Sequence, residues 1–335
     1  MSSWVAASTA LLGGGPRRLR HPAIIDDGFV FEHSAHGMSH ASTLCVSQGR
    51  LVAAWFGGSL ESRPDVSILV SLNEGDGWSP PREVANGVQP GGERLACWNP
   101  VLFQPSGGPL LLFYKVGARP KTWWGMCMRS ADGGLSWSEP WRLPEGVLGP
   151  IKNKPVELAA GELLSPSSIE HQGWRVHLER SRDLGVSWER IEPLDSDRPL
   201  QAIQPSVLRY ADGRLQLLCR SKHGRLAESW SLDGGDRWSA LELTVLPNPN
   251  SGTDAVSLAD GRQLLVYNRS KRRRSKLGIA LSRDGRRWRD VLQLEGGAGE
   301  YSYPAVIQAP DGLVHLSYSW NLSRIRHVVV DPARL

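Results

Sequence analysis

The stretch that decides the fold is Ser130–Trp137, Ser-Ala-Asp-Gly-Gly-Leu-Ser-Trp, and its Ser, Asp, Gly and Trp return with the same spacing in Ser181–Trp188 and Ser231–Trp238. Two copies follow the pattern less closely: Ser71–Trp78 has Asn in place of Asp, and Ser282–Trp288 is one residue short. The closing tryptophans stand at positions 78, 137, 188, 238 and 288, a spacing of 50 to 59 residues. A regular period of this length predicts a radial array of similar units.

The repeated phrase has the composition of a tight hairpin turn. Its Asp can accept hydrogen bonds from backbone N–H groups two or three residues on, and its Gly adopts a backbone angle that other residues resist. Its Trp can pack a broad apolar face beneath the turn. We therefore expect each copy to be a self-contained turn between two strands.

A second, fainter repeat gives the number of units. A glycine recurs just before a strand-like apolar run, as Gly49, Gly108, Gly161, Gly213, Gly261 and Gly312. Six glycines against five Asp turns predict six four-stranded blades, the last one without its turn because the chain stops or closes the ring. The expected fold is all-β, a six-bladed β-propeller that uses residues 1–335 as one domain.

Composition agrees with a turn-rich β protein. The chain has 36 Gly, 23 Pro, 14 Trp and 4 Met in 335 residues, and no stretch shows sustained helical periodicity. The formal net charge of +5 is local, because six basic residues lie between Arg269 and Lys276. Such a loop is typical of a solvated hairpin, and no base-stacking pattern accompanies it, so we expect no nucleic-acid partner.

The sequence also bears on the cellular location of the protein and on its cofactors. No stretch has the apolar length of a membrane span. The mildly apolar segment Trp4–Gly15 has no positive residue before it, so we expect a cytoplasmic protein, with secretion left open. The four cysteines lack metal-ligand spacing and are expected to be buried free thiols. No His or carboxylate cluster has ligand spacing either, so we expect no metal and no cofactor.

In a propeller, residues at the same phase of each repeat converge near the central axis. The residues nine places before the six glycines are His40, Asn99, Lys152, Gln204, Gly252 and Tyr303. Proline directly follows Asn99, Gln204 and Tyr303, and also Lys154, which places a polar side chain just before a strand begins. The fifth repeat offers a polar loop that ends in Asp254. This ring is either a polar ligand site or a lining for channel water.

Charged residues beside strands suggest what such a ligand carries. Arg220 and Arg274 each border an apolar strand, and arginine suits bidentate recognition of a carboxylate. A loop of the first repeat holds Glu61, Arg63 and Asp65 and could overhang the funnel. A carboxyl group there is a candidate general acid. For Asp65, the alternatives are a salt bridge to Arg63 or a turn cap.

The repeats and the phase positions together resemble the sialidase (neuraminidase) superfamily over essentially the whole chain, where the repeated turn is called an Asp box. The finer match is to the bacterial branch of predicted neuraminidases, and it lies in His40–Leu44, Trp98–Pro100, Gln204–Leu208, Asn248–Asp254 and Tyr301–Ala305.

Members of this superfamily use a tyrosine nucleophile, a glutamate that assists it, a carboxylic acid on a first-blade loop and three arginines that bind the sugar carboxylate. The resemblance implies that Tyr303 is the nucleophile, with Tyr301 as the competing choice, and that Glu61 or else Asp65 is the acid. Arg220 and Arg274 resemble the second and third arginines.

Two positions depart from the pattern of the superfamily. His40 stands where the first arginine is expected, and Gln204 stands where the glutamate is expected, although an amide cannot act as a base. His40 could supply the missing proton acceptor, because an imidazole titrates near neutrality. The remaining candidates for substrate binding are Arg63, Asn99, Lys154 and Asp254.

These residues predict a sialidase-like glycoside hydrolase that removes a terminal acidic sugar from a glycan or glycoconjugate, with sialic acid as one candidate. One alternative is a lyase acting on a uronic acid, in which His40 and a tyrosine move a proton. The other is a non-catalytic carbohydrate-binding propeller. The oligomeric state is left open.

Overall fold

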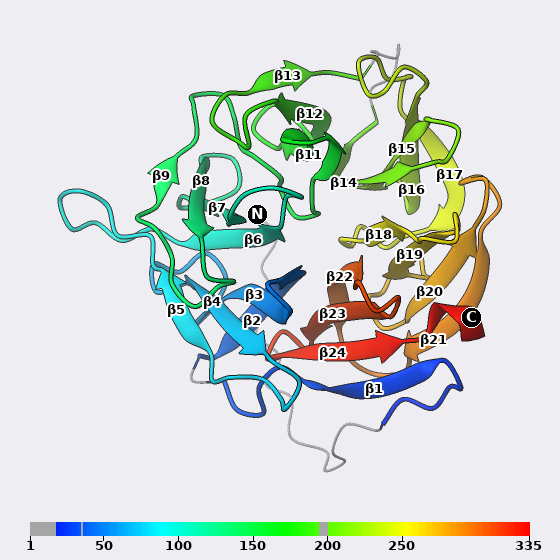
Figure 1. The fold of residues 1–335 in the computed structure, drawn as a ribbon, viewed down its shortest axis with the longest axis horizontal. Helices are drawn as coiled ribbons and strands as arrows, with labels where there is room; N and C mark the ends of the chain where they lie inside the picture. The colour runs from blue at the N-terminus through cyan, green and yellow to red at the C-terminus, as the bar shows by residue number, and fades with distance from the viewer. Residues whose placement is uncertain (1–17, 35, 194–199) are drawn as a thin grey trace.

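The computed structural model describes residues 18–34, 36–193 and 200–335, so Trp4–Gly15 lies outside the described residues. The described chain forms six four-stranded antiparallel sheets arranged around an axis (Figure 1). The predicted fold class, an all-β six-bladed propeller, is confirmed. In the first five blades the strands pair in chain order, from the innermost to the outermost.

The strands of blades 1 to 3 are as follows. Blade 1 contains β2 (Met38–Ser47), β3 (Arg50–Gly58), β4 (Ser67–Asn73) and β5 (Arg82–Ala85). Blade 2 contains β6 (Cys97–Phe103), β7 (Leu110–Val116), β8 (Trp124–Ser130) and β9 (Trp141–Arg142). Blade 3 contains β10 (Val156–Ala159), β11 (Glu162–Ile169), β12 (Arg175–Ser181) and β13 (Glu189–Ile191).

The strands of blades 4 to 6 complete the ring. Blade 4 contains β14 (Ala202–Arg209), β15 (Leu215–Ser221), β16 (Arg225–Ser231) and β17 (Glu242–Pro247). Blade 5 contains β18 (Asp254–Ser257), β19 (Gln263–Asn268), β20 (Leu277–Ser282) and β21 (Arg289–Glu295). Blade 6 contains β22 (Tyr301–Gln308), β23 (Val314–Trp320) and β24 (Arg324–Val330), and its fourth strand is β1 (Ile24–Phe29).

The fourth strand of blade 6 explains the missing sixth Asp turn. β1 comes from the start of the chain and pairs antiparallel with β24, with Gly28 opposite His327. The two strands lie along the same edge of the ring in Figure 1. Of the two explanations left open by the sequence, closure of the ring is therefore the one that the structure shows.

The Asp turns join the third and fourth strands of their blades. Asp132 accepts from Ser136 N at 2.8 Å and from Ser130 Oγ at 2.8 Å, while Gly134 N donates to Ser130 Oγ at 2.7 Å. In the shortened copy, Asp284 accepts from the N–H groups two and three residues on. The expectation of two or three residues was therefore wrong for Asp132, where the acceptor reaches four residues on.

Tryptophans and glycines of the repeats complete the turns. The indole N–H of Trp188, of Trp238 and of Trp288 donates to the carbonyl of the glycine three residues before it, at 2.8 to 3.0 Å. All six glycines of the second repeat have positive φ angles, between 77° and 122°, and they lie in the turns between first and second strands.

Apolar packing between neighbouring blades supplies the core. Trp55, Trp238, Tyr267 and Tyr318 are among the largest side chains that are fully buried. All four cysteines are buried and free, as predicted. The described residues include one short 3₁₀ helix, η1 (Pro332–Arg334), and no described helix has the length and apolar character needed to cross a membrane.

Antiparallel pairing divides the loops between two faces of the ring. The first strand of a blade begins at the face where the second strand ends, and we call this the funnel face. The Asp turns and the glycine turns both lie at the opposite face, which we call the turn face. Loops that join second to third strands, and loops that join successive blades, therefore meet on the funnel face.

Candidate functional site

Four innermost strands carry the same bulge where they begin. Pairing with the second strand shifts between His40 and Thr43 in β2, and at equivalent places in β6, β14 and β22. Inside these bulges Ala41, Asn99, Gln204 and Tyr303 have φ angles of 50°, 38°, 57° and 54°. Bulges re-aim side chains, and strained backbone of this kind gathers at functional sites. By its backbone, Ala41 rather than His40 is the first-blade equivalent of Tyr303.

Arg220 lies at the centre of the funnel, near the end of β15. Its Nη1 donates to Tyr303 Oη at 2.6 Å and to Gln204 Oε1 at 3.1 Å. Its Nε and Nη2 donate to Asn250 Oδ1 at 3.0 and 2.8 Å. The side chain is buried, with its guanidinium 5.0 Å from the ring centre of Trp174. A fixed positive charge is thus aimed at the tyrosine hydroxyl.

Asn250 bridges the two arginines that the sequence singled out. Its main-chain oxygen accepts from Arg220 Nη2 at 2.8 Å and from Arg274 Nη2 at 3.1 Å. Arg274, in the loop between β19 and β20, also donates to Glu300 Oε1 at 3.1 Å. The oxygens of Asn250 therefore occupy the place where a ligand carboxylate between the two guanidinium groups would sit. The sequence placed Asn250 in a polar loop without assigning it this contact.

Tyr303 and Tyr301 are two residues apart but have different surroundings. The Tyr303 ring lies near two cations, with the guanidinium carbon of Arg220 5.6 Å and that of Arg274 5.7 Å from its centre. Tyr301 is buried in the apolar core between blades 5 and 6, and its hydroxyl donates to Ala298 O at 2.9 Å. Because the bulge at Tyr303 interrupts strand alternation, the ring of Tyr303 faces the two guanidinium groups, whereas Tyr301 contacts Arg274 through the main chain, its N donating to Arg274 O at 2.8 Å.

The floor beneath Tyr303 is formed by backbone without a side chain. A Cβ on Gly252 would stand 3.2 Å from Tyr303 Cγ and 3.2 Å from Lys152 Cε. Lys152 is fully buried, and its ammonium donates to Thr253 O at 3.1 Å and to Pro304 O. Burial, against the raising effect of Asp254 and together with the charges of Lys154 and Arg220, lowers the pKa of Lys152 to about 7. Lys152 thus ties the backbone next to Gly252 to the backbone next to Tyr303.

His40 contacts Tyr303 from blade 1, at 4.3 Å between ring centres. Its Nδ1 is hydrogen-bonded to Ser319 Oγ at 2.8 Å. Burial, together with the charges of Arg274, Lys152 and Arg220, lowers the pKa of His40 to about 3. An imidazole with such a pKa is neutral at pH 7 and is a weak proton acceptor, so the structure does not fit His40 to the role of a base or acid.

The two candidate acids on the first-blade loop differ in environment. Glu61 is exposed, yet desolvation raises the pKa of its carboxyl group. Arg274 and Arg220 lower this pKa, Glu300 and Glu170 raise it, and the overall shift is upward. Glu61 lies in the loop between β3 and β4, which is on the funnel face. A carboxyl group with a raised pKa suits a proton donor.

Asp65 instead caps its own loop. Its Oδ2 accepts from Ser59 N at 2.8 Å and its Oδ1 from Ser59 Oγ at 2.9 Å. Desolvation works against the shift, but the hydrogen bonds from Ser59 lower the pKa of Asp65. Of its two structural alternatives, the turn cap is the one observed, and no ion pair joins Asp65 to the exposed Arg63 among the described residues.

Lys154 and Asp254 bind each other near the axis. Lys154 Nζ donates to Asp254 Oδ2 at 2.9 Å and to Ala255 O at 3.0 Å. Asp254 is buried, and its carboxylate also accepts from Ser206 Oγ and Val306 N. This pair ties blades 3, 4, 5 and 6 together, and its charges are already matched within the protein. Asn99 is buried in the bulge of β6.

Sequence reasoning missed a carboxylate on blade 3. Glu170 follows β11, and its Oε2 accepts from Trp174 Nε1 at 3.1 Å. Desolvation raises the pKa of Glu170, against the lowering effects of Arg220, Trp174, Lys222 and Lys121. Glu170 stands outside the phase of the innermost strands, so the spacing of the repeats could not reveal it.

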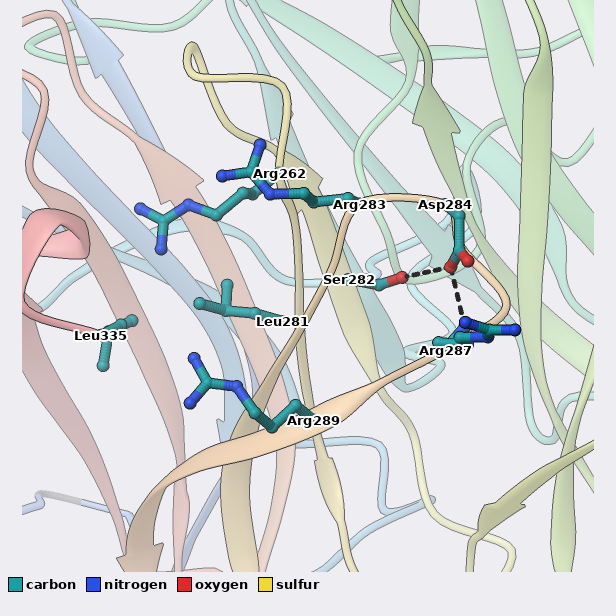
Figure 2. Close-up of a pocket in the computed structure, with 8 residues that line it drawn as sticks. All are labelled: Arg262, Leu281, Ser282, Arg283, Asp284, Arg287, Arg289 and Leu335. Atoms are coloured by element: carbon teal, nitrogen blue, oxygen red, sulfur yellow. Dashed lines mark hydrogen bonds between the residues drawn. The ribbon is translucent and has the colours of Figure 1, made fainter.

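One cavity lies at the turn face, away from the funnel. It has a volume of about 450 Å³ and is lined by Leu281, Leu335 and several residues around the shortened Asp turn. Figure 2 shows the side chains of Arg262, Arg283 and Arg289 pointing to one side of that turn. Within the described ranges, no group of three or more His, Cys, Asp or Glu could hold a metal ion.

Comparison with known proteins identifies the family. The model of the BNR repeat-like domain matches residues 49–316. This chain belongs to the BNR repeat-like domain family. The match covers all of the Asp turns and the five innermost strands from β6 to β22, and together with the six sheets it makes the chain a sialidase-like BNR propeller.

Relatives of this BNR repeat-like chain are distant. The anhydrosialidase of Macrobdella decora is 26% identical over 237 residues, which are 58% of this chain and 30% of that protein. The chain thus spans less than a third of that curated relative. A protein of unknown function from Dyadobacter fermentans has a TM-score of 0.76 at 21% identity, covering 93% of this chain and 100% of the other. The intramolecular trans-sialidase of Ruminococcus gnavus has a TM-score of 0.74 at 14% identity, covering 94% and 99%. These structures share the propeller fold.

Proposed function

We propose that this protein is a glycoside hydrolase that removes a terminal acidic sugar from a glycan, with Tyr303 as nucleophile and Glu61 as general acid and base. The observation that carries the proposal is the contact between Arg220 Nη1 and Tyr303 Oη at 2.6 Å. A guanidinium that donates to this oxygen stabilises the negative charge that develops there when the tyrosine attacks. The names of the relatives, an anhydrosialidase and a trans-sialidase, support the same chemistry.

The two chemical steps use groups that meet in the funnel. Tyr303 Oη forms a bond to the anomeric carbon while the glycosidic bond breaks, Glu61 gives its proton to the departing oxygen, and the phenolic proton passes to water. In the second step Glu61 removes a proton from a water molecule, which attacks the same carbon. The bond to Tyr303 then breaks, and the tyrosine oxygen regains a proton from water.

Substrate selection rests on the two arginines. Arg220 and Arg274 converge on Asn250, and a sugar carboxylate that replaced the oxygens of Asn250 would contact both guanidinium groups. Gln204 accepts a hydrogen bond from the same guanidinium, but its amide cannot act as a base. Arg220 would therefore activate the tyrosine by stabilising the phenolate, and the proton of the hydroxyl would pass to water.

The test is release of a fluorophore from aryl glycosides of sialic acid, of glucuronic acid and of neutral sugars. We expect turnover of an acidic glycoside alone, and a loss of at least about a hundredfold in kcat for Tyr303→Phe. Tyr301→Phe is the matched control, because it removes a hydroxyl that donates to Ala298 O in the core between blades 5 and 6, and it should keep nearly full activity. Equal loss in both variants would contradict the assignment of the nucleophile.

The pH profile tests Glu61 separately. Because a general acid must be protonated, kcat should fall as the pH rises through the raised pKa of Glu61. Glu61→Gln should lose this alkaline limb together with most activity, and an aryl leaving group that needs little protonation should lessen the loss. A profile that is unchanged by Glu61→Gln would assign the acid elsewhere.

A second candidate function is supported by a specific contact. Asn250 already accepts from both arginines, and among the described residues no carboxylate is hydrogen-bonded to Tyr303, as would suit a propeller that binds a sugar without cleaving it. Calorimetry with free sialic acid separates the two functions, because binding without turnover of any glycoside would favour the binding protein. The lyase is disfavoured by the neutral, buried state of His40.

A further inference from the structure

The cavity of about 450 Å³ on the turn face lies at the end of blade 5 (Figure 2). Its walls come from the glycine turn before β19, the shortened Asp turn between β20 and β21, the start of β21, and Leu335. Cavities that bind small molecules have volumes of about 300 to 1,000 Å³, so this one is large enough for a small ligand. None of the residues that line it belongs to the funnel, so it is separate from the candidate reaction centre.

Strand register brings two arginines together at this cavity. The outermost pair between β19 and β20 is Gln263 with Ser282. Arg262 and Arg283 are the next residues outward on the two strands, so they lie opposite each other beyond that pair. Because side chains alternate along a strand, Arg283 shares a face of the sheet with Leu281. Figure 2 shows the guanidinium groups of both arginines on one side of that leucine.

Arg262 is held in place by contacts that use only part of its guanidinium. Its Nε donates to Asp260 Oδ2 at 2.8 Å, and its Nη2 lies 2.7 Å from the same oxygen and donates to Pro332 O at 2.6 Å. Its Nη1 has no hydrogen bond to any described residue, so it is available to a ligand. The side chain is therefore ordered before binding, which lowers the entropic cost of binding.

Arg283 has no partner of opposite charge within the described part of the chain. Its side chain is exposed, and its guanidinium has no hydrogen bond or ion pair there. The nearby carboxylates are already engaged: Asp260 binds Arg262, and Asp284 accepts from Ser282 Oγ at 3.1 Å and from two N–H groups of its own turn. Like charges directly opposite each other on paired strands are destabilising. An anion that contacted both guanidinium groups would relieve this repulsion.

The surroundings of the cavity favour an anion as well. Between Asp254 and Glu295, blade 5 has eleven Lys and Arg residues and five Asp and Glu residues, whereas the whole chain has a net charge of +5. The rest of the chain is therefore close to neutral, and blade 5 carries the positive charge of the protein. Such a field raises the local concentration of anions and disfavours cations.

The arrangement of the two arginines suits a phosphate or sulfate group better than a carboxylate. One bidentate arginine uses both oxygens of a carboxylate, whereas a phosphate or sulfate monoester has three free oxygens that can accept from two guanidinium groups at once. Leu281 and Leu335 line the same cavity and provide apolar surface for the organic part of such an ester. The walls thus combine two cations with an apolar floor.

We propose that this cavity binds a small monoester of phosphoric or sulfuric acid, with the oxyanion between Arg262 and Arg283 and the organic group against Leu281 and Leu335. The site lies on the face opposite the funnel and is independent of the proposed glycosidase function. The ligand is selected by its charge and by the number of its free oxygens.

Calorimetry tests the site directly. Phenyl phosphate and phenyl sulfate are titrated separately into the full chain, in a buffer without phosphate and at constant ionic strength. We expect about millimolar or tighter binding, and at least about tenfold weaker binding to Arg283→Met, typical of a lost charge-assisted hydrogen bond. Binding of the phosphate ester alone would identify a phosphorylated ligand, and binding of the sulfate ester alone a sulfated one.

Two variants show whether the anion is bound by this pair of arginines. Arg289→Met removes the same charge from the same cavity, but Arg289 pairs with Leu281 from β21 and lies on the other side of that leucine in Figure 2. It should weaken ester binding by less than about threefold, as expected for an exposed charge without direct contact. Arg220→Met removes a charge from the funnel, whose arginines also attract anions, and should leave ester binding to the cavity unchanged.

Leu335→Ala tests the contact with the organic group. It shortens an apolar side chain of the cavity, so it should weaken phenyl phosphate binding by about threefold and leave the binding of inorganic phosphate unchanged. Because Leu335 packs against the core between blades 5 and 6, thermal unfolding must show that this variant folds. Arg283→Met replaces an exposed side chain, so its folding should be unaffected.

The outcomes separate this site from the funnel and from general attraction of anions. Ester binding that is lost in Arg283→Met but kept in Arg289→Met and Arg220→Met supports the site, whether or not the protein cleaves any glycoside. Absence of binding of both esters to the wild type overturns it. Equal losses in Arg283→Met and Arg289→Met, or a loss in Arg220→Met alone, also overturn it, because the anion would then be held by net charge or by the funnel.

Discussion

The two faces of the propeller are built from different kinds of contact. On the turn face, Asp183 is satisfied by residues two to four positions away, through Ser181 Oγ, Val186 N and Ser187 N. On the funnel face, Arg220 reaches Asn250 and Tyr303, which are 30 and 83 positions away. Local contacts make each blade fold in the same way, whereas the distant contacts form a site only after the ring has closed.

The largest effect on activity is expected when the positive charge of Arg220 is removed from the funnel. Arg220→Met keeps much of the side-chain volume but leaves Tyr303 and Asn250 without their donor. We expect a loss of at least about a hundredfold in kcat/KM on the acidic aryl glycoside, typical of a lost donor to a developing anion. Steady-state fluorescence measures the loss.

Arg289→Met is the control for that experiment. Arg289 is an exposed arginine of the turn face, so its removal should change kcat/KM by less than about twofold. If both variants lost activity equally, net charge rather than the geometry of the funnel would be responsible.

A mutation on the turn face should give the opposite pattern. Asp183→Ala removes an acceptor from three partners in its turn, and we expect about 1 kcal/mol of lost stability, by analogy with a helix N-cap, with kcat/KM unchanged. Urea unfolding measures the loss. Glu139→Ala, an exposed carboxylate just past another Asp turn, should be neutral. Loss of activity in the folded Asp183→Ala variant would show that the two faces are coupled.

The contrast also explains what the sequence could and could not predict. The blade count and the Asp turns were predictable because Ser, Asp, Gly and Trp act within eight residues of one another. Tyr303 and Arg220 were found by phase and by resemblance, but their direct contact depends on a backbone bulge that no periodicity reports. Glu170 was missed because its loop lies out of phase.

Asn250 shows the same limit at a single residue. The sequence contains a polar Asn-Pro-Asn loop, but its contact with two arginines depends on a positive φ angle of 59° and on the packing of blades 4 and 5. Likewise, Lys154 and Asp254 lie two residues past the phase positions Lys152 and Gly252, and they bind each other near the axis. The position of a residue within the repeat predicts that it lies near the axis, but it does not predict which side chain it will bind.

Asn250 offers a smaller test of the funnel. Asn250→Gly keeps the positive φ and removes the amide oxygen that competes with a ligand, so a sugar carboxylate should bind about five- to tenfold more tightly. Asn250→Asp places a carboxylate between the arginines and should abolish that binding. Calorimetry with sialic acid distinguishes them. Weaker binding to Asn250→Gly would mean that Asn250 organises the arginines instead of competing for them.

The smallest expected effect is on the pH dependence of the free energy of unfolding, where the Asp turns and the buried histidines should act in different pH ranges. Burial lowers the pKa of His40 and that of His327 from 6.5 to about 3, so the folded state binds fewer protons than the unfolded state below pH 6.5. The burial of these neutral imidazoles therefore costs no stability above pH 6.5, whereas the protein loses stability as the pH falls from 6.5 toward 3. The pKa of Asp183 is about 2, lowered from 3.8 mainly by hydrogen bonds against the opposing effect of desolvation, so the turns lose their contribution only below 3.8.

Between pH 4 and 6.5 the slope of the free energy of unfolding against pH should thus contain a contribution from the buried histidines, alongside that of carboxyl groups with a raised pKa such as Glu295, and little from the Asp turns. His327→Asn should lower that slope by up to about one proton, while Asp183→Ala should leave it unchanged. Urea unfolding at several pH values measures both. An equal change in slope for the two variants would contradict this prediction. It would mean that the Asp183 carboxylate titrates well above its lowered pKa, and that the hydrogen bonds of the turn do not stabilise its charged form.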